Sequence, residues 1–233
     1  MKNKDLQFDR KVHVLYSKQC EKEIKRKIKI HYRNDICEDV WTNVQLQYVK
    51  YLNDYKKDLG GKKNFHNGKA GTYDCIALIS YYVVCKDKTN IKEIEEMEEN
   101  LFLPAFKSLK FVDANKLVFK KLLYKSFKIA KKKCDKWKDY EMVIDPFSKD
   151  KPIHYIFKSC PIVEFAKSHN LEEIMPAMCN PDYKAMELLK AKLVRPCTIA
   201  NGNICDYYIC GNRDVYLEEH SEYIDEMGFR KNK

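Results

Sequence analysis

The stretch that decides the fold class is residues 141–157, which read E-M-V-I-D-P-F-S-K-D-K-P-I-H-Y-I-F. Its two ends, Glu141–Ile144 and Ile153–Phe157, are short runs rich in β-branched and aromatic residues, which favour strands. The residues between them include an Asp-Pro and a Lys-Pro pair, which are typical of turns. The stretch therefore predicts an antiparallel hairpin.

The chain before this hairpin has the periodicity of helices. Apolar residues recur at helical spacing in five segments, at about 10–31, 35–59, 73–85, 90–106 and 113–137. Thr72 and Thr89 are predicted to cap the third and the fourth helix. Pro104 is predicted to kink or end the fourth helix.

Short helices and a second hairpin are predicted after residue 157. Pro161–Ser168 and Asp182–Lys190 have the composition of short helices, and Leu193–Ala200 and Ile204–Cys210 flank an Asn-Gly pair that favours a hairpin turn. Helices followed by strands with interspersed helices indicate an α+β fold rather than alternating βαβ units.

We expect a single α+β domain over residues 1–233, a length that one large domain can hold. In this interpretation a mainly helical portion, 1–138, packs on a small antiparallel sheet within 139–213. The charged tail at 214–233 is expected to form one more short helix or to fray.

The composition argues against several classes of protein. With 45% hydrophobic residues the chain is expected to be globular, and its longest apolar runs, such as Cys75–Cys85, are much shorter than the roughly 20 residues of a membrane span. The first residues lack the pattern of a secretory signal, which predicts a cytoplasmic protein. The formal charge of +10 comes from 38 Lys and only 6 Arg, so neither nucleic acid nor membrane is expected as a partner. The oligomeric state is left open.

Cysteines and aspartates gather between residues 160 and 206. Cys160 precedes a proline at a predicted helix start, where backbone N–H groups favour a thiolate; the alternative is a small buried side chain. Asp182 is expected either to cap the next helix or to bind a cation. Cys205 and Asp206 are adjacent on a predicted strand, so their side chains should point to opposite faces.

These residues give the chain a resemblance to the L-2-amino-thiazoline-4-carboxylic acid hydrolase family. Members similarly show a Cys that opens a helix, a second Cys followed by Asp, and a T-x-A-x-G stretch that ends in Cys-Asp; the loop from Gly60 also fits. The resemblance covers roughly the second half of the chain plus that loop. It implies that a small cyclic amidine, such as L-2-amino-thiazoline-4-carboxylate, is hydrolysed to N-carbamoyl-L-cysteine without a cofactor.

The resemblance also implies roles for individual residues. The candidate catalytic residues are Cys160, Cys179, Cys205 and Asp206. The candidate substrate-binding residues are Asp182, Gly60, Gly61, Asn64 and Arg195. Members often place an aromatic and then a basic residue after the Cys-Asp pair, whereas this chain has two tyrosines, so Arg195 is one candidate for the missing carboxylate anchor. Which cysteine attacks is left open.

A second, more distant resemblance is to vinyl-reductase-type sensor domains, in which a hairpin ends with Cys, a Gly-containing turn and Cys. Cys197 and Cys205 match that spacing. This resemblance implies a non-catalytic domain that binds a small molecule, in some cases with a structural zinc, for which Cys179 would be a third ligand. A fourth ligand is not evident in the sequence.

Overall fold

The structure is a computed structural model that describes residues 15–54, 70–137 and 140–233. The chain divides into two compact units, Met1–Leu101 and Phe102–Lys233. The single domain predicted over 1–233 depends on how these units associate and stays a prediction. Among the described residues, no helix combines the length and the apolar character that crossing a membrane requires.

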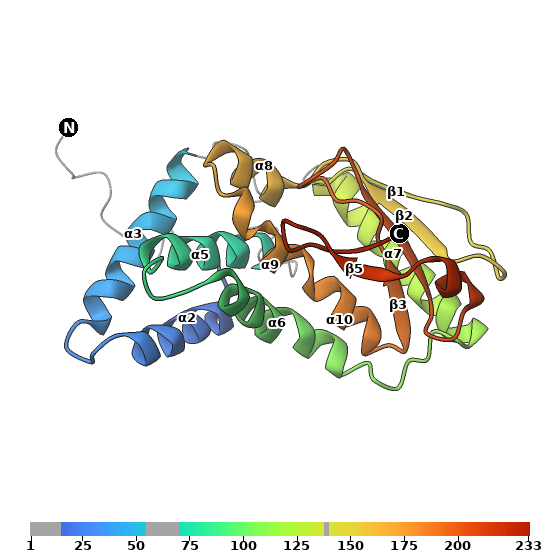
Figure 1. The fold of residues 1–233 in the computed structure, drawn as a ribbon, viewed down its shortest axis with the longest axis horizontal. Coiled ribbons are helices and arrows are strands. Elements are labelled where there is room, and N and C mark those ends of the chain that lie inside the picture. Colours follow the sequence, from blue (N-terminus) through green and yellow to red (C-terminus); the bar gives the residue numbers. More distant parts are fainter. Residues whose placement is uncertain (1–14, 55–69, 138–139) are drawn as a thin grey trace. The chain divides into compact units, whose positions relative to one another are not determined.

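The described part of the first unit is helical (Figure 1). Its helices are α2 (Lys18–His31), α3 (Cys37–Asp54), α5 (Ala70–Val84) and the beginning of α6 (Ile91–Lys107). Helix α2 begins at Lys18 because the Ser17 hydroxyl accepts a hydrogen bond from the Cys20 N–H at 3.0 Å. The Asp74 carboxylate in turn accepts hydrogen bonds from the main-chain N–H and the hydroxyl of Ser17. A side chain from α5 thus fixes the start of α2.

Two predicted helix caps are wrong. Thr72 lies inside α5 and is buried, because this helix already begins at Ala70. The start of α6 is capped by Asn90, whose Oδ1 accepts a hydrogen bond from the Glu93 N–H at 3.0 Å, rather than by Thr89. Pro104 lies within the last turns of α6, which continues to Lys107.

The second unit contains a four-stranded antiparallel sheet in the order β1-β2-β4-β3. Its strands are β1 (Met142–Ile144), β2 (Ile153–Phe157), β3 (Ala191–Val194) and β4 (Cys205–Gly211). The predicted hairpin of β1 with β2 is present, and β3 pairs antiparallel with β4 as predicted. The predicted bounds of the second hairpin are wrong, because β3 ends at Val194 and residues 195–204, with the Asn-Gly pair, form a longer connection instead of a strand and a tight turn. Central strand β4 pairs with β2 so that Tyr207 lies opposite Tyr155 and Cys205 opposite Phe157. The α+β prediction is confirmed.

The two faces of this sheet differ. One face carries Tyr155, Tyr207 and Ile209, and helix α7 (Leu117–Trp137) packs on it, with the Phe127 ring 4.7 Å from the Tyr155 ring (Figure 1). The opposite face carries side chains of alternate residues, among them Asp206. Four short helical segments lie between β2 and β3: α8 (Pro161–Ser168), η2 (Glu172–Ile174), α9 (Met175–Cys179) and α10 (Pro181–Glu187).

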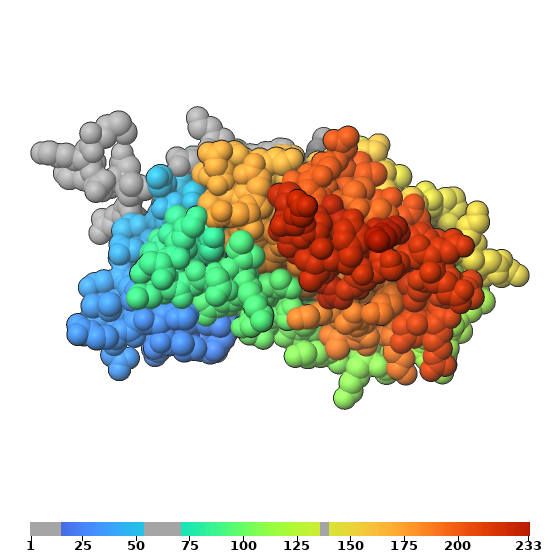
Figure 2. Space-filling model, viewed as in Figure 1, coloured from blue at the N-terminus to red at the C-terminus, as the bar shows by residue number. Residues whose placement is uncertain are grey.

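The C-terminal segment is folded. Of the two alternatives expected for it, fraying is wrong, and one more short helix is present, as a 3-10 helix. The segment forms η3 (Val215–Glu219) and a two-stranded antiparallel hairpin of β5 (Glu222–Ile224) and β6 (Arg230–Asn232). The hairpin turn needs a glycine, because Gly228 has a φ of +90°. Figure 2 shows these C-terminal residues, in red, spread over the visible face of the second unit.

Candidate functional site

Cys160 is the N-cap residue of α8, as the Cys-Pro pair predicts. Hydrogen bonds from the main-chain N–H groups of Ile162 and Val163 act to lower the pKa of its thiol, but burial has the larger effect and raises the pKa above the ordinary value. The thiol of the free protein is therefore neutral near pH 7. The expectation of a thiolate at this position is corrected, because desolvation outweighs the helix start.

Cys179 and Asp182 lie at the corner where α9 ends and α10 begins. The N-cap residue of α10 is Asn180, and Asp182 sits in the first turn, so the capping role considered for Asp182 is wrong. The side chain of Asp182 keeps 35% of its surface exposed. Burial raises the pKa of the Cys179 thiol well above its ordinary value.

One oxygen of Asp182 is held by two side chains. The hydroxyl of Tyr207 donates a hydrogen bond to Oδ2 at 3.0 Å, and Nη1 of Arg195 lies 3.7 Å from the same oxygen. Neither of these contacts involves Oδ1, which has no protein partner in the described part of the chain. Burial raises the pKa of this carboxyl, while the charge of Arg195 and the Tyr207 hydroxyl act to lower it. Asp182 is thus an oriented carboxylate with one oxygen available.

Tyr207 is fixed in place by the rings around it. Its ring stacks on Tyr155, with centroids 4.9 Å apart and planes at 10°, and meets Phe157 edge-on at 5.9 Å. The guanidinium of Arg195 lies 5.8 Å from the centroid of the Tyr207 ring. The side chain that orients Asp182 therefore has little freedom to move.

Cys205, at the start of β4, faces the same side of the sheet as Tyr207. Its sulfur accepts a hydrogen bond from the Ile199 N–H at 3.3 Å, and burial raises the pKa of the thiol to about 12. Only 6% of the residue is exposed. Cys205 therefore supports the wall of the site as a neutral, bonded thiol.

Five of the predicted residues converge in this part of the second unit. Electrostatic interactions link the thiol of Cys179 with those of Cys160 and Cys205, and with Asp182 and Arg195. Cys160, Cys179 and Asp182 keep solvent-accessible surface although burial is the largest influence on the pKa of each. We call these five residues the Asp182 site.

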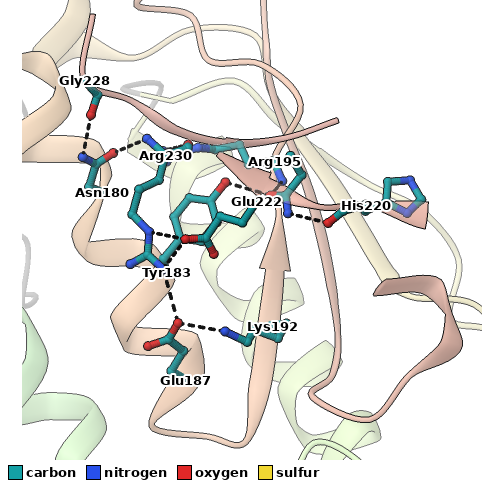
Figure 3. A network of polar contacts seen from close by, with 10 residues as sticks. Asn180, Tyr183, Glu187, Lys192, Arg195, His220, Glu222, Gly228 and Arg230 are labelled. Carbon is teal, nitrogen blue, oxygen red and sulfur yellow. Dashed lines mark hydrogen bonds and ion pairs between the residues drawn. The ribbon is translucent and has the colours of Figure 1, made fainter. Parts of the chain in front are cut away.

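Arg195 is buried within the protein, with a side chain 0% exposed. Its Nη1 donates to the main-chain oxygen of Cys179 at 2.8 Å, and its Nη2 to that of Arg230 at 3.0 Å. Figure 3 shows this contact with β6. Because both terminal nitrogens already have protein partners, Arg195 supports Asp182 from behind, and its role as an anchor for a substrate carboxylate stays a prediction.

Asp206 lies on the opposite face of the sheet from Cys205, and there it belongs to a second cluster. The imidazole of His154 bridges two carboxylates, with Nε2 2.8 Å from Asp206 and Nδ1 2.8 Å from Asp145. Burial acts to lower the pKa of His154, but the hydrogen bonds with these carboxylates have the larger combined effect and raise it. The His154 ring also stacks on Tyr208, with centroids 4.3 Å apart.

This second cluster borders a cavity of about 690 Å³. Its lining includes His154, Asp145, Tyr208 and Tyr216, and none of the residues of the Asp182 site. The structure therefore separates the predicted catalytic pair, Cys205 and Asp206, between two faces of the sheet. The catalytic role of Asp206 stays a prediction.

Among the described residues, one predicted residue remains outside both clusters. Cys197 is half-buried, and its pKa is raised by burial and by the neighbouring Asp206 rather than by another thiol. Across the described ranges, no group of three or more His, Cys, Asp or Glu side chains is arranged to hold a metal ion. Gly60, Gly61 and Asn64 lie outside the described residues, so their predicted roles are not tested.

Sequence reasoning singled out Tyr207 only as a departure from the family pattern and missed Asn180 and Asn232 altogether. The alternation of β4 offered one signal for Tyr207, because a residue two positions after Cys205 faces the same side. Nothing in the sequence pointed to Asn232, whose contacts depend on how the C-terminal hairpin docks.

Comparison with known proteins agrees with the motifs. The family model described as L-2-amino-thiazoline-4-carboxylic acid hydrolase matches residues 76–209, which is more than half of the chain. No curated protein and no solved structure gives a significant match. The matched range contains every member of the Asp182 site.

Proposed function

Since this chain belongs to the L-2-amino-thiazoline-4-carboxylic acid hydrolase family, we propose that it hydrolyses a cyclic amidine at the Asp182 site. The proposed reaction converts a substrate such as L-2-amino-thiazoline-4-carboxylate to N-carbamoyl-L-cysteine. The observation that carries this proposal is the half-held carboxylate of Asp182, whose Oδ2 is bonded by Tyr207 while Oδ1 is available.

A carboxylate in this state suits an amidine. The N–H groups of a protonated amidine form charge-assisted hydrogen bonds with a carboxylate oxygen, which favours the cationic and more electrophilic form of the ring. Asp206 is a poorer partner, because its carboxylate already faces the imidazole of His154, whose raised pKa favours a cation at that position. We therefore assign amidine binding to Asp182.

The proposed reaction begins with attack by water on the ring carbon between sulfur and nitrogen. A carbon–oxygen bond forms and the carbon–sulfur bond breaks. Because the protonated ring already carries a proton on its nitrogen, one proton of the water ends on the leaving sulfur and the other is released to solvent, so the product carries a urea group and a free thiol. We assign the attack to water because burial raises the pKa of Cys160, Cys179 and Cys205, which makes thiolates scarce in the free protein.

The test compares two carboxylates on opposite faces of the sheet. The purified protein is incubated with L-2-amino-thiazoline-4-carboxylate, and free thiol is followed with a disulfide reagent while the product mass is recorded. Asp182→Asn is expected to lower kcat/KM about a hundredfold or more, as the loss of a group that stabilises reacting charge typically does. Asp206→Asn, on the opposite face, is expected to stay within about threefold of the unmodified chain, a result that would count against the catalytic role predicted for Asp206 from the sequence.

The results that would reject the proposal are concrete. No thiol release by the unmodified protein rejects the reaction, and equal losses in the two variants reject the assignment to Asp182. A covalent adduct on Cys160 or Cys179, found by mass spectrometry of the reacting enzyme, would replace water by a cysteine as the nucleophile. Circular dichroism of each variant verifies that the fold is retained.

A further inference from the structure

The hairpin formed by β5 and β6 lies beyond residue 209, where the family match ends, yet it contacts both segments that carry the Asp182 site. We infer that this hairpin positions Arg195 and, through it, the carboxylate of Asp182, with Asn232 as the positioning residue. The catalytic part of this inference rests on the proposed function, whereas its structural part does not.

The first attachment joins β6 to the residue that follows β3. The side-chain oxygen of Asn232 accepts a hydrogen bond from the Arg195 N–H at 2.9 Å, and the Asn232 N–H donates to the Arg195 carbonyl oxygen at 3.2 Å. The same side-chain oxygen also accepts from the hydroxyl of Tyr183 at 2.9 Å. Only 5% of Asn232 is exposed, so water cannot readily replace these partners.

Arg195 depends on this strand for most of its hydrogen bonds. Two bonds join its main chain to Asn232, and a third joins its Nη2 to the carbonyl oxygen of Arg230. The remaining one runs from Nη1 to the carbonyl oxygen of Cys179. Strand β6 therefore sets where the buried guanidinium lies relative to Asp182.

The second attachment is at the corner between α9 and α10. The side-chain oxygen of Asn180 accepts a hydrogen bond from the Arg230 N–H, and its amide nitrogen donates to the Gly228 carbonyl oxygen, both at 3.0 Å (Figure 3). Asn180 stands between Cys179 and Asp182 in the sequence. The hairpin thus holds the segment with the thiol and the carboxylate at one point and Arg195 at another.

Charged contacts keep the hairpin itself in place. The guanidinium of Arg230 lies 2.8 Å from Glu222 on β5 and 3.3 Å from Glu187 at the end of α10, and 4.5 Å from the centroid of the Tyr183 ring (Figure 3). These contacts lie around Tyr183 and do not include Asp182. They join β6 to β5 and to the end of α10.

Removal of the Asn232 side chain should act on Asp182 in a predictable direction. Asn232→Ala leaves the Arg195 N–H and the Tyr183 hydroxyl without their shared acceptor. The main chain of Arg195 then keeps one of its two bonds to β6, and the guanidinium, still bonded to the Cys179 and Arg230 carbonyl oxygens, shifts with the main chain. Since the charge of Arg195 acts to lower the pKa of Asp182, its displacement raises that pKa further. The carboxylate then takes up its proton at a higher pH than in the unmodified chain.

The experiment measures this titration in two ways. The carboxyl carbon of Asp182 is followed by ¹³C NMR across the pH range, and kcat/KM for the cyclic amidine is measured at pH 6 and pH 8.5. For Asn232→Ala we expect an upward shift of about one pKa unit, hence a loss of activity up to about tenfold larger at pH 6 than at pH 8.5. The matched control is Ile224→Ala, which changes an exposed residue of the same hairpin.

The outcomes separate the possibilities. A protein that only loses stability would show equal losses at both pH values and an unchanged Asp182 titration, which would overturn the inference. If the unmodified chain has no activity, the proposed function fails, and the NMR titration still decides the positioning role. Should Asn232→Ala not fold, Asn180→Ala tests the second attachment with the same expected shift, and an unchanged titration there would count against the hairpin.

Discussion

Replacing Arg195 by methionine tests how much the second unit depends on one buried cation. The substitution keeps a long apolar stem but removes the groups that bond the carbonyl oxygens of Cys179 and Arg230. Two partly buried acceptors then lose these bonds, at a cost of roughly 1–3 kcal/mol each. The substitution also removes the positive charge that lies 3.7 Å from the Asp182 carboxylate, which adds to this cost.

We therefore expect Arg195→Met to lower the free energy of unfolding by about 3–5 kcal/mol, the range found when one partner of a buried charged pair is removed. Urea denaturation followed by circular dichroism measures this loss. Arg213→Met, the same change at an exposed arginine of the same unit, is the control and should cost less than about 1 kcal/mol. A loss below 1 kcal/mol for Arg195→Met would refute the reasoning that its two carbonyl partners need this cation.

Three further predictions concern titration. Tyr207→Phe removes a hydrogen bond to Asp182 worth about 1.5 kcal/mol, which is the low end of the range for hydrogen bonds to charged groups because this carboxylate is partly exposed. The acid limb of the pH profile of kcat/KM should therefore move up by about one pH unit. Tyr208→Phe, on the other face of the sheet, should not move it. Because the pKa of Cys205 is about 12, its thiol should react with iodoacetamide at pH 8 at least about a hundredfold more slowly in the native than in the denatured protein. Peptide mass spectrometry measures the two rates. Equal rates would contradict the burial of this thiol. The pKa of His154 is raised in the folded protein, so its stabilising effect is fully present below about pH 6.5 and is lost as the pH rises through the folded pKa. In thermal unfolding, His154→Gln should therefore destabilise the protein more at pH 6 than at pH 9. The reverse order would be inconsistent with the bridge between the two carboxylates.

Local sequence signals predicted much of the fold. Helix α8 begins and ends at the predicted residues, because a Cys-Pro pair fixes its start, and the β1–β2 hairpin follows from β-favouring runs around turn residues. The pairing of β3 with β4 was predicted too, but residues 195–200 were wrongly assigned to the first of these strands. The helix caps were less predictable. Thr72 has the chemistry of a cap but lies inside α5, where burial within a longer apolar helix outweighs the local preference.

The candidate site was predictable in part for the same reason. Strand alternation correctly separated Cys205 from Asp206, which are bonded to partners on different faces. The charge state of the thiols could not be read from the sequence, because it depends on how much protein surrounds each sulfur. The support of Arg195 by β6 was equally hidden, since those hydrogen bonds join residues that are 35 and 37 positions apart.

The alternation of β4 also limits which changes in length this protein can accept. Inserting one residue between Asp206 and Tyr207, while the later part of the strand keeps its register, would turn Cys205 toward the face with the His154 cluster and Asp206 toward the face with Asp182. The segment 195–204 between β3 and β4 does not have this constraint along its whole length, because it lies outside the ladder. Homologous chains should therefore differ in length in that connection, while the spacing from Cys205 to Tyr208 stays unchanged.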